Sequence, residues 1–191
     1  MEELFQKLTY RPGDRFAPVQ PPQTITASLF MHVDDRQLVH LEGLNFDRNR
    51  DIYFCNIPES VIMKIDMKKK ELIKFYEFEN KSFKPSAVKI HKDGRLFICG
   101  VDLNPAHMNE NGGIYTLDPD GTNLTPVMTG MSVNDMVFDS EGGIYFDNYQ
   151  GIPQNPTGSI EYLTPDLKEQ KTVVPGLASP NGICLSTDNK I

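Results

Sequence analysis

Four oxygen-bearing side chains recur at one position of a repeated sequence pattern. Each lies four residues before an apolar residue that recurs at spacings of 44, 48 and 47. The polar residues are Glu42, Ser86, Asn134 and Asn181, and the apolar ones are Phe46, Ile90, Phe138 and Leu185. A carboxylate and amide carbonyls are the hard oxygen ligands that Ca²⁺ prefers, whereas zinc requires His or Cys, which this position lacks. The spacing therefore predicts a calcium site, with Ser86 as its weakest member, facing the pocket.

A simpler interpretation is that polar residues begin strands as turn formers or as hydrogen-bonding strand ends. It suits one such residue better than four at a single repeat offset, so we favour the metal site. Further polar residues flank it. Asp135, on the opposite face of its strand, is expected to support a ligand, reach a second ion or form ordinary hydrogen bonds. Asn148 is expected either to line the pocket or to have a structural role. His107 lies in a long predicted loop and is expected either to act as an acid or base or to be an ordinary solvated side chain.

Short strands must position these residues. Three segments share an apolar run, a polar turn and a second apolar run: 41–56, 85–100 and 133–148. A second hairpin follows within each unit, at 62–75, 113–127 and 159–174. Four strands every 40 to 50 residues is the period of a β-propeller blade. A β-sandwich has no such period, and helical repeats need a 3.6-residue periodicity that is absent after residue 10.

The repeat divides the chain into one incomplete propeller domain. The predicted parts are an N-terminal arm with a leading strand (1–40, strand 24–33), blade 1 (41–84), blade 2 (85–132), blade 3 (133–179) and the start of blade 4 (180–191). Propellers close with four or more blades. We therefore expect the sequence to be the N-terminal part of a longer chain, or a truncated product of one.

Composition excludes several classes of function. The 191 residues carry a net charge of −7, which argues against a nucleic-acid-binding face. No apolar stretch reaches the roughly 18 residues of a membrane span, and the first residues lack a secretory apolar region. Three widely spaced cysteines predict buried, reduced thiols in a cytoplasmic protein. Nucleophile-elbow, P-loop and dinucleotide motifs are absent, so any chemistry is expected to be metal-assisted.

Four motifs of the repeat resemble the senescence-marker-protein/gluconolactonase family, closest to its drug-responsive lactonase branch. They are Leu41–Asp47, Lys89–Phe97, Asn134–Asp139 and Asn181–Ile183. The resemblance covers about residues 23–191 and implies an all-β, six-bladed β-propeller, of which this chain holds about three blades and the start of a fourth. It also implies lactone hydrolysis with a divalent ion, usually Ca²⁺, in the central channel.

By position, the resemblance makes Glu42, Asn134 and Asn181 metal ligands. The family's remaining ligand, an Asp that also transfers the proton, is expected beyond Ile191, so the catalytic residue is unknown and this fragment alone is expected to be inactive. The alternatives are a non-catalytic binding propeller and an inactive truncated product. The expected small-molecule partner is a lactone substrate. The expected protein partner is either a second copy of the chain or the missing C-terminal half. Neither nucleic acid nor a membrane is an expected partner.

Overall fold

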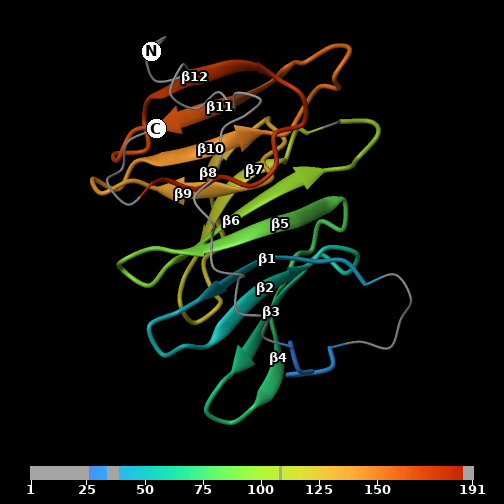
Figure 1. The fold of residues 1–191 in the computed structure, drawn as a ribbon, viewed down its shortest axis with the longest axis vertical. Helices are drawn as coiled ribbons and strands as arrows, with labels where there is room; N and C mark the ends of the chain where they lie inside the picture. The colour runs from blue at the N-terminus through green and yellow to red at the C-terminus, as the bar shows by residue number, and fades with distance from the viewer. Residues whose placement is uncertain (1–25, 34–38, 108, 187–191) are drawn as a thin grey trace, which may run out of the picture. The chain divides into compact units, whose positions relative to one another are not determined.

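The structure is a computed structural model that describes residues 26–33, 39–107 and 109–186 (Figure 1). The chain divides into two compact units, residues 1–33 and 34–191, and every assigned strand lies in the second. Residues 26–33 form no strand, so the leading strand predicted over 24–33 is wrong for these residues, and positions 24 and 25 lie outside the description. An extended segment becomes a strand only where a neighbour pairs with its backbone. The described residues contain no helix, and thus none that spans a membrane.

Within the described ranges, twelve strands form three antiparallel four-stranded sheets in chain order (Figure 1). Sheet 1 comprises β1 (Leu41–Phe46), β2 (Ile52–Asn56), β3 (Val61–Asp66) and β4 (Glu71–Glu77). Sheet 2 comprises β5 (Phe83–Ile90), β6 (Leu96–Asp102), β7 (Gly113–Leu117) and β8 (Thr125–Thr129). Sheet 3 comprises β9 (Met136–Phe138), β10 (Ile144–Asn148), β11 (Gly158–Leu163) and β12 (Gln170–Leu177). The all-β class and the four strands in each repeated unit are therefore confirmed.

Carboxylates close the first hairpin of sheets 1 and 3 in the same way. Asp47 Oδ1 accepts hydrogen bonds from the backbone N–H groups of Asn49 and Asp51, at 2.8 and 2.9 Å. Asp139 Oδ1 repeats this with Glu141 and Gly143, at 2.9 and 2.8 Å. Such side-chain bonds offer the backbone a ready turn, which is why Asp is favoured there. The repeat seen in the sequence is thus a repeat of turn chemistry.

Sheet 2 is buried on both faces because alternate residues of its strands point in opposite directions. Ile98 of β6 belongs to a core cluster shared with sheet 1, where it joins Ile62. Cys99, the next residue, belongs to a second cluster shared with sheet 3, where it joins Phe146. All four side chains are fully buried, and each aliphatic or aromatic one contributes about 1.5–3 kcal/mol by leaving water. This packing fixes the three sheets face to face within residues 34–191.

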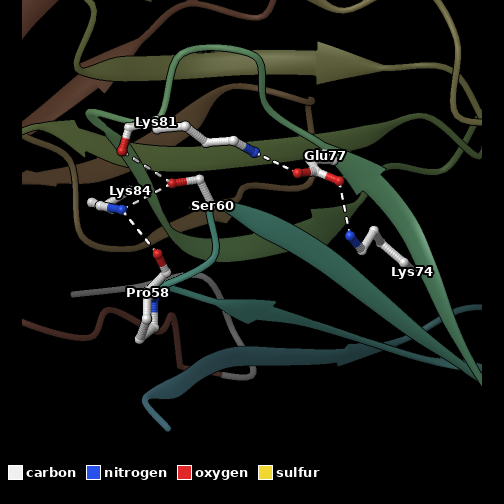
Figure 2. Close-up of polar contacts among 6 residues, drawn as sticks. All are labelled: Pro58, Ser60, Lys74, Glu77, Lys81 and Lys84. Atoms are coloured by element: carbon white, nitrogen blue, oxygen red, sulfur yellow. Dashed lines mark hydrogen bonds and ion pairs between the residues drawn. The ribbon is translucent and has the colours of Figure 1, made fainter. Parts of the chain in front are cut away.

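A polar cluster pins the link between sheets 1 and 2 (Figure 2). Lys84 Nζ donates to the carbonyl oxygen of Pro58 at 3.1 Å and to Ser60 Oγ at 3.0 Å. Ser60 Oγ, which is fully buried, in turn donates to the carbonyl oxygen of Lys81 at 3.3 Å. Lys81 Nζ lies 2.6 Å from Glu77 at the end of β4. The link from β4 to β5 is therefore held at both ends.

The first strands of the three sheets are neighbours: β1 contacts β5, and β5 contacts β9. Glu42 lies on β1 and Ser86 lies on β5. Asn134 was expected to begin an inner strand, but it lies two residues before β9. Asn181 was expected to begin another, but residues 180–186 form no strand. For Asn134 the reason is that β9 is only three residues long, and the carboxylate of Asp147 takes the N–H groups of Asn134 and Asp135 that a longer ladder would use.

Candidate functional site

Glu42 lies on β1, opposite Cys55 of β2. Next to it, Gly43 has a φ of 60°, and a side chain there would collide with the backbone of Ala87 on β5. Only glycine adopts this conformation at no cost in so close an approach. The register shift that follows Glu42 brings β1 against β5. The Glu42 carboxylate is about half exposed, at 48%, and its Oε1 lies 3.1 Å from His40 Nε2.

Two side chains hold the backbone around Asn134. The carboxylate of Asp147, on β10, accepts the N–H groups of Asn134 at 2.6 Å and of Asp135 at 3.1 Å. Ser86 Oγ, on β5, donates to the carbonyl oxygen of Val133 at 2.9 Å. Burial raises the pKa of Asp147 to about 7, against the opposing effect of the two N–H groups that it accepts. The segment that carries Asn134 is thus fixed from both neighbouring strands.

Asp135 joins three parts of the chain. Its Oδ1 lies 2.8 Å from Lys89 Nζ on β5 and accepts the N–H of Met136 at 2.8 Å. Its Oδ2 accepts the N–H of Ile183 at 3.2 Å. Both charged side chains are about one fifth exposed, which makes this ion pair much less hydrated than the surface pairs of the chain. Through Ile183, Asp135 also fixes the segment that carries Asn181.

Asn181 and Asn148 stand at the edge of this network. Asn181 is exposed, and its side chain has no hydrogen bond within the described part of the chain. Asn148 follows Asp147 on β10, and its Oδ1 is buried with no hydrogen-bond partner among the described residues. The N–H of Asp147 donates to the carbonyl oxygen of Asp135, and the N–H of Tyr149 donates to that of Ser132. Asn148, which lies between the two donors, is therefore placed beside the segment that carries Asn134. A buried amide oxygen without a partner is costly, and a bound cation satisfies it.

Two cysteine thiols in the strands that carry or neighbour these residues, Cys55 and Cys99, are fully buried. Burial raises the pKa of Cys55 well above its usual range, and the negative charges of Glu42 and Asp135 add to the effect. Burial likewise raises the pKa of Cys99, with Asp135 and Asp147 adding to it. Of these carboxylates, Glu42 belongs to sheet 1, where it lies opposite Cys55, and Asp147 belongs to sheet 3.

The remaining predicted residue, His107, lies elsewhere. It is largely exposed in the loop after β6, and its Nδ1 lies 3.1 Å from Glu110. No interaction among the described residues brings it to Asn134. Within the described ranges, no three His, Cys, Asp or Glu side chains gather as a ready-made metal site. The candidate site depends instead on one carboxylate with amide oxygens, a set that suits Ca²⁺ and not zinc.

Sequence reasoning did not single out Lys89 or Asp147. Lys89 directly precedes Ile90, one of the aligned apolar residues, on a strand whose other central residues are buried. A lysine in such a strand indicates a buried partner, because an unpaired ammonium does not stay inside a protein. Asp147 is the penultimate residue of an apolar strand, IYFDN, and is only 1% exposed. A carboxylate at the end of a buried strand carries a similar signal.

Known proteins share both the sequence and the fold. No family model matches the chain. It is 38% identical over 173 residues to lactonase drp35 of Staphylococcus aureus (strain MRSA252), covering 88% of this chain and 51% of the relative. It is 36% identical over 193 residues to lactonase drp35 of Staphylococcus haemolyticus (strain JCSC1435), covering 97% and 57%. The chain thus spans about half the length of the curated relatives that it matches.

Two solved structures share the fold at low sequence identity. A calcium-binding protein, regucalcin, from Agrobacterium tumefaciens gives a TM-score of 0.60 at 18% identity, over 82% of this chain and 50% of that one. A gluconolactonase, XC5397 from Xanthomonas campestris, gives 0.63 at 17% identity, over 80% and 53%. At such identities the likeness concerns the fold alone. The described sheets are accordingly propeller-like.

Proposed function

The chain is a relative of the staphylococcal drp35 lactonases, as its motifs predicted, and on that premise we propose that it is part of a Ca²⁺-dependent lactonase. The substrate is a lactone, a cyclic carboxylic ester, and the reaction is its hydrolysis. In the proposed whole protein, the three sheets described are half of a six-bladed propeller. The observation that carries the proposal is the fixed Asn134 segment beside the unpartnered Asn148 oxygen.

The residues present fit a hard cation. Glu42 supplies the formal charge, and Asn134 and Asn181 supply amide oxygens. Asn148 offers a buried oxygen that has no other described partner, and Ser86 is committed to holding Val133. When bound, such an ion supplies polarisation of the lactone carbonyl and stabilisation of negative charge on its oxygen.

The neighbouring residues position this ligand set. Asp147 holds the two N–H groups that fix Asn134, and Asp135 holds the Ile183 N–H that fixes Asn181. Lys89 compensates the charge of Asp135, so that this carboxylate is not free to act as a base. The proton-transfer Asp implied by the family resemblance matches no residue of the 191. We therefore propose that this chain by itself is a poor lactonase.

The experiment is an assay of the full-length protein with a panel of γ- and δ-lactones. Hydrolysis is expected with Ca²⁺, is lost with a chelator and returns when Ca²⁺ is added back. Hydrolysis that survives complete removal of divalent ions contradicts the metal-dependent mechanism. Calcium binding and lactone binding without hydrolysis would instead favour the alternative, a non-catalytic binding propeller.

The 191-residue chain provides the matched comparison. It is expected to turn over the same lactones far more slowly than about 1 s⁻¹, the lower end of ordinary enzyme turnover. A rate in the ordinary range would mean that the catalytic groups lie within these residues. The predicted cytoplasmic location and the absence of nucleic-acid and membrane partners stay predictions.

A further inference from the structure

A second pocket lies between sheets 1 and 2, among residues that the candidate metal site does not use. Four aromatic rings line it: Tyr76 of β4, Phe78 just beyond β4, Phe83 of β5 and Tyr115 of β7. Successive ring centroids lie 5.0, 4.6 and 5.1 Å apart, so the rings form one continuous row. Phe78 and Phe83 are almost wholly buried and anchor the row in the core. The wall is therefore rigid and formed mainly by aromatic carbon.

One carboxylate lines this pocket. Glu79 is its only charged lining residue, and it has no ion pair or hydrogen bond within the described part of the chain. Lys74 and Lys81 both lie beside Glu77, at 2.9 and 2.6 Å (Figure 2), and neither of them lines the pocket. Burial raises the pKa of Tyr76, and the charge of Glu79 adds to it. Glu79 therefore acts on the same wall.

The far end of the wall is held by a hydrogen bond of Tyr115. Burial, together with the charge of Asp102, raises the pKa of Tyr115. The Tyr115 hydroxyl donates to the carbonyl oxygen of Asn111 at 2.7 Å, which fixes the orientation of the ring. Aromatic faces also carry negative electrostatic potential. An aromatic wall with a carboxylate beside it favours a cation over an anion.

We propose that this pocket binds a small organic ammonium ion, with aromatic rings against its methyl groups and Glu79 as its counter-ion. Cation–π attraction and a carboxylate are the usual recognition chemistry for quaternary ammonium groups. The pocket volume is about 250 Å³, below the roughly 300–1,000 Å³ of sites for drug-sized ligands. The occupant is therefore small, about the size of choline. A strongly hydrated metal ion suits this wall poorly, because the aromatic rings supply no oxygen ligands.

The test compares choline with 3,3-dimethyl-1-butanol, its neutral isostere, on the 191-residue protein. Calorimetry or NMR titration is expected to show choline binding at least about tenfold more tightly, since cation–π attraction and the Glu79 charge are both lost with the neutral compound. The tyrosine ring signals are expected to shift with choline. Equal binding of the two compounds would mean an apolar pocket without cation selectivity. The absence of any choline binding would overturn the proposal outright.

Variants assign the binding to the pocket. Glu79→Gln and Tyr115→Leu are each expected to weaken choline binding by about two- to fivefold, the equivalent of an exposed cation–π or ion contact. Tyr115→Phe keeps the ring and is expected to retain affinity, which covers the case in which Tyr115→Leu fails to fold. Glu71→Gln, at the opposite end of β4, is the matched control and should change nothing. Unchanged affinity in Glu79→Gln contradicts the assignment.

Discussion

The carboxylate of Asp135 accepts the backbone N–H of Ile183 at 3.2 Å, across 48 positions of the chain. The same carboxylate lies 2.8 Å from the ammonium group of Lys89. One side chain therefore connects the first strand of sheet 2, the approach to β9 and the segment that follows β12. Both Asn134 and Asn181 depend on it for their positions.

Removal of one partner of the Lys89–Asp135 pair is expected to destabilise the protein. Asp135→Asn leaves a partly buried ammonium without its counter-charge, at a cost of about 1–3 kcal/mol, less than for a fully buried pair because both groups are about one fifth exposed. In a double-mutant cycle with Lys89→Met, the combined loss should be smaller than the sum of the single losses. Denaturant unfolding measures all three variants. Asp166→Asn, in an exposed pair at 3.7 Å, is the control and should cost much less, because water already screens that pair.

Calcium affinity in the full-length protein is expected to depend on Glu42. Glu42→Gln removes the formal charge of the proposed ligand set and should weaken Ca²⁺ binding about tenfold or more. Isothermal calorimetry gives the affinity. Glu71→Gln removes a carboxylate from the same sheet and should leave the affinity unchanged. A Glu42→Gln protein with native affinity would remove Glu42 from the ligand set.

Acid is expected to weaken the fold through Asp51. Its hydrogen bond with Lys64, at 2.9 Å, lowers its pKa below the ordinary value near 3.8, and the N–H of Met67 adds to this against the effect of burial. A lowered folded-state pKa means that the stabilisation is fully present above about pH 4 and is lost as the pH falls through the folded value. Unfolding measured between pH 7 and pH 2 should show this loss. Asp51→Asn should show a shallower dependence over the same range, and an unchanged slope would argue against the pair.

Thiol reactivity should separate the three cysteines. Cys55 and Cys99 are buried and have raised pKa values, whereas Cys184 is exposed. In the native protein one thiol is expected to react rapidly with Ellman's reagent, and denaturant should release two more. Cys184→Ser should remove the rapid phase. Rapid reaction of two or three thiols in the native state would contradict the packing around β2 and β6.

The 191-residue chain is expected to self-associate when it is alone in solution. Leu44 and Phe46 of β1 are 59% and 55% exposed, so the first strand presents apolar side chains to water. Light scattering should report a dimer or larger species. The double variant Leu44→Ser, Phe46→Ser should shift the chain toward monomer, and a stable monomer of the unchanged protein would contradict the expectation.

The sequence alone determined the elements of this protein, because their signals are local. Alternating apolar residues favour each strand. Asp47 and Asp139 favour the turns of two hairpins in the same way, because each carboxylate accepts hydrogen bonds from the N–H groups two and four residues further along the chain. The period of about 44 to 48 residues then predicted four strands per unit. The short hairpins left little freedom in how these strands pair, so the three sheets followed.

Only the tertiary structure decided which side chains meet. The pairing of Lys89 with Asp135 and the bond from Ile183 to Asp135 join residues 46 and 48 positions apart, and such contacts depend on how sheets pack, for which no local pattern exists. The same holds for the aromatic pocket, where Tyr76 and Tyr115 come from different sheets. The strand expected over residues 26–33 is the converse case. Its sequence favours an extended backbone, but a strand also requires a hydrogen-bonded neighbour, which a local sequence cannot supply.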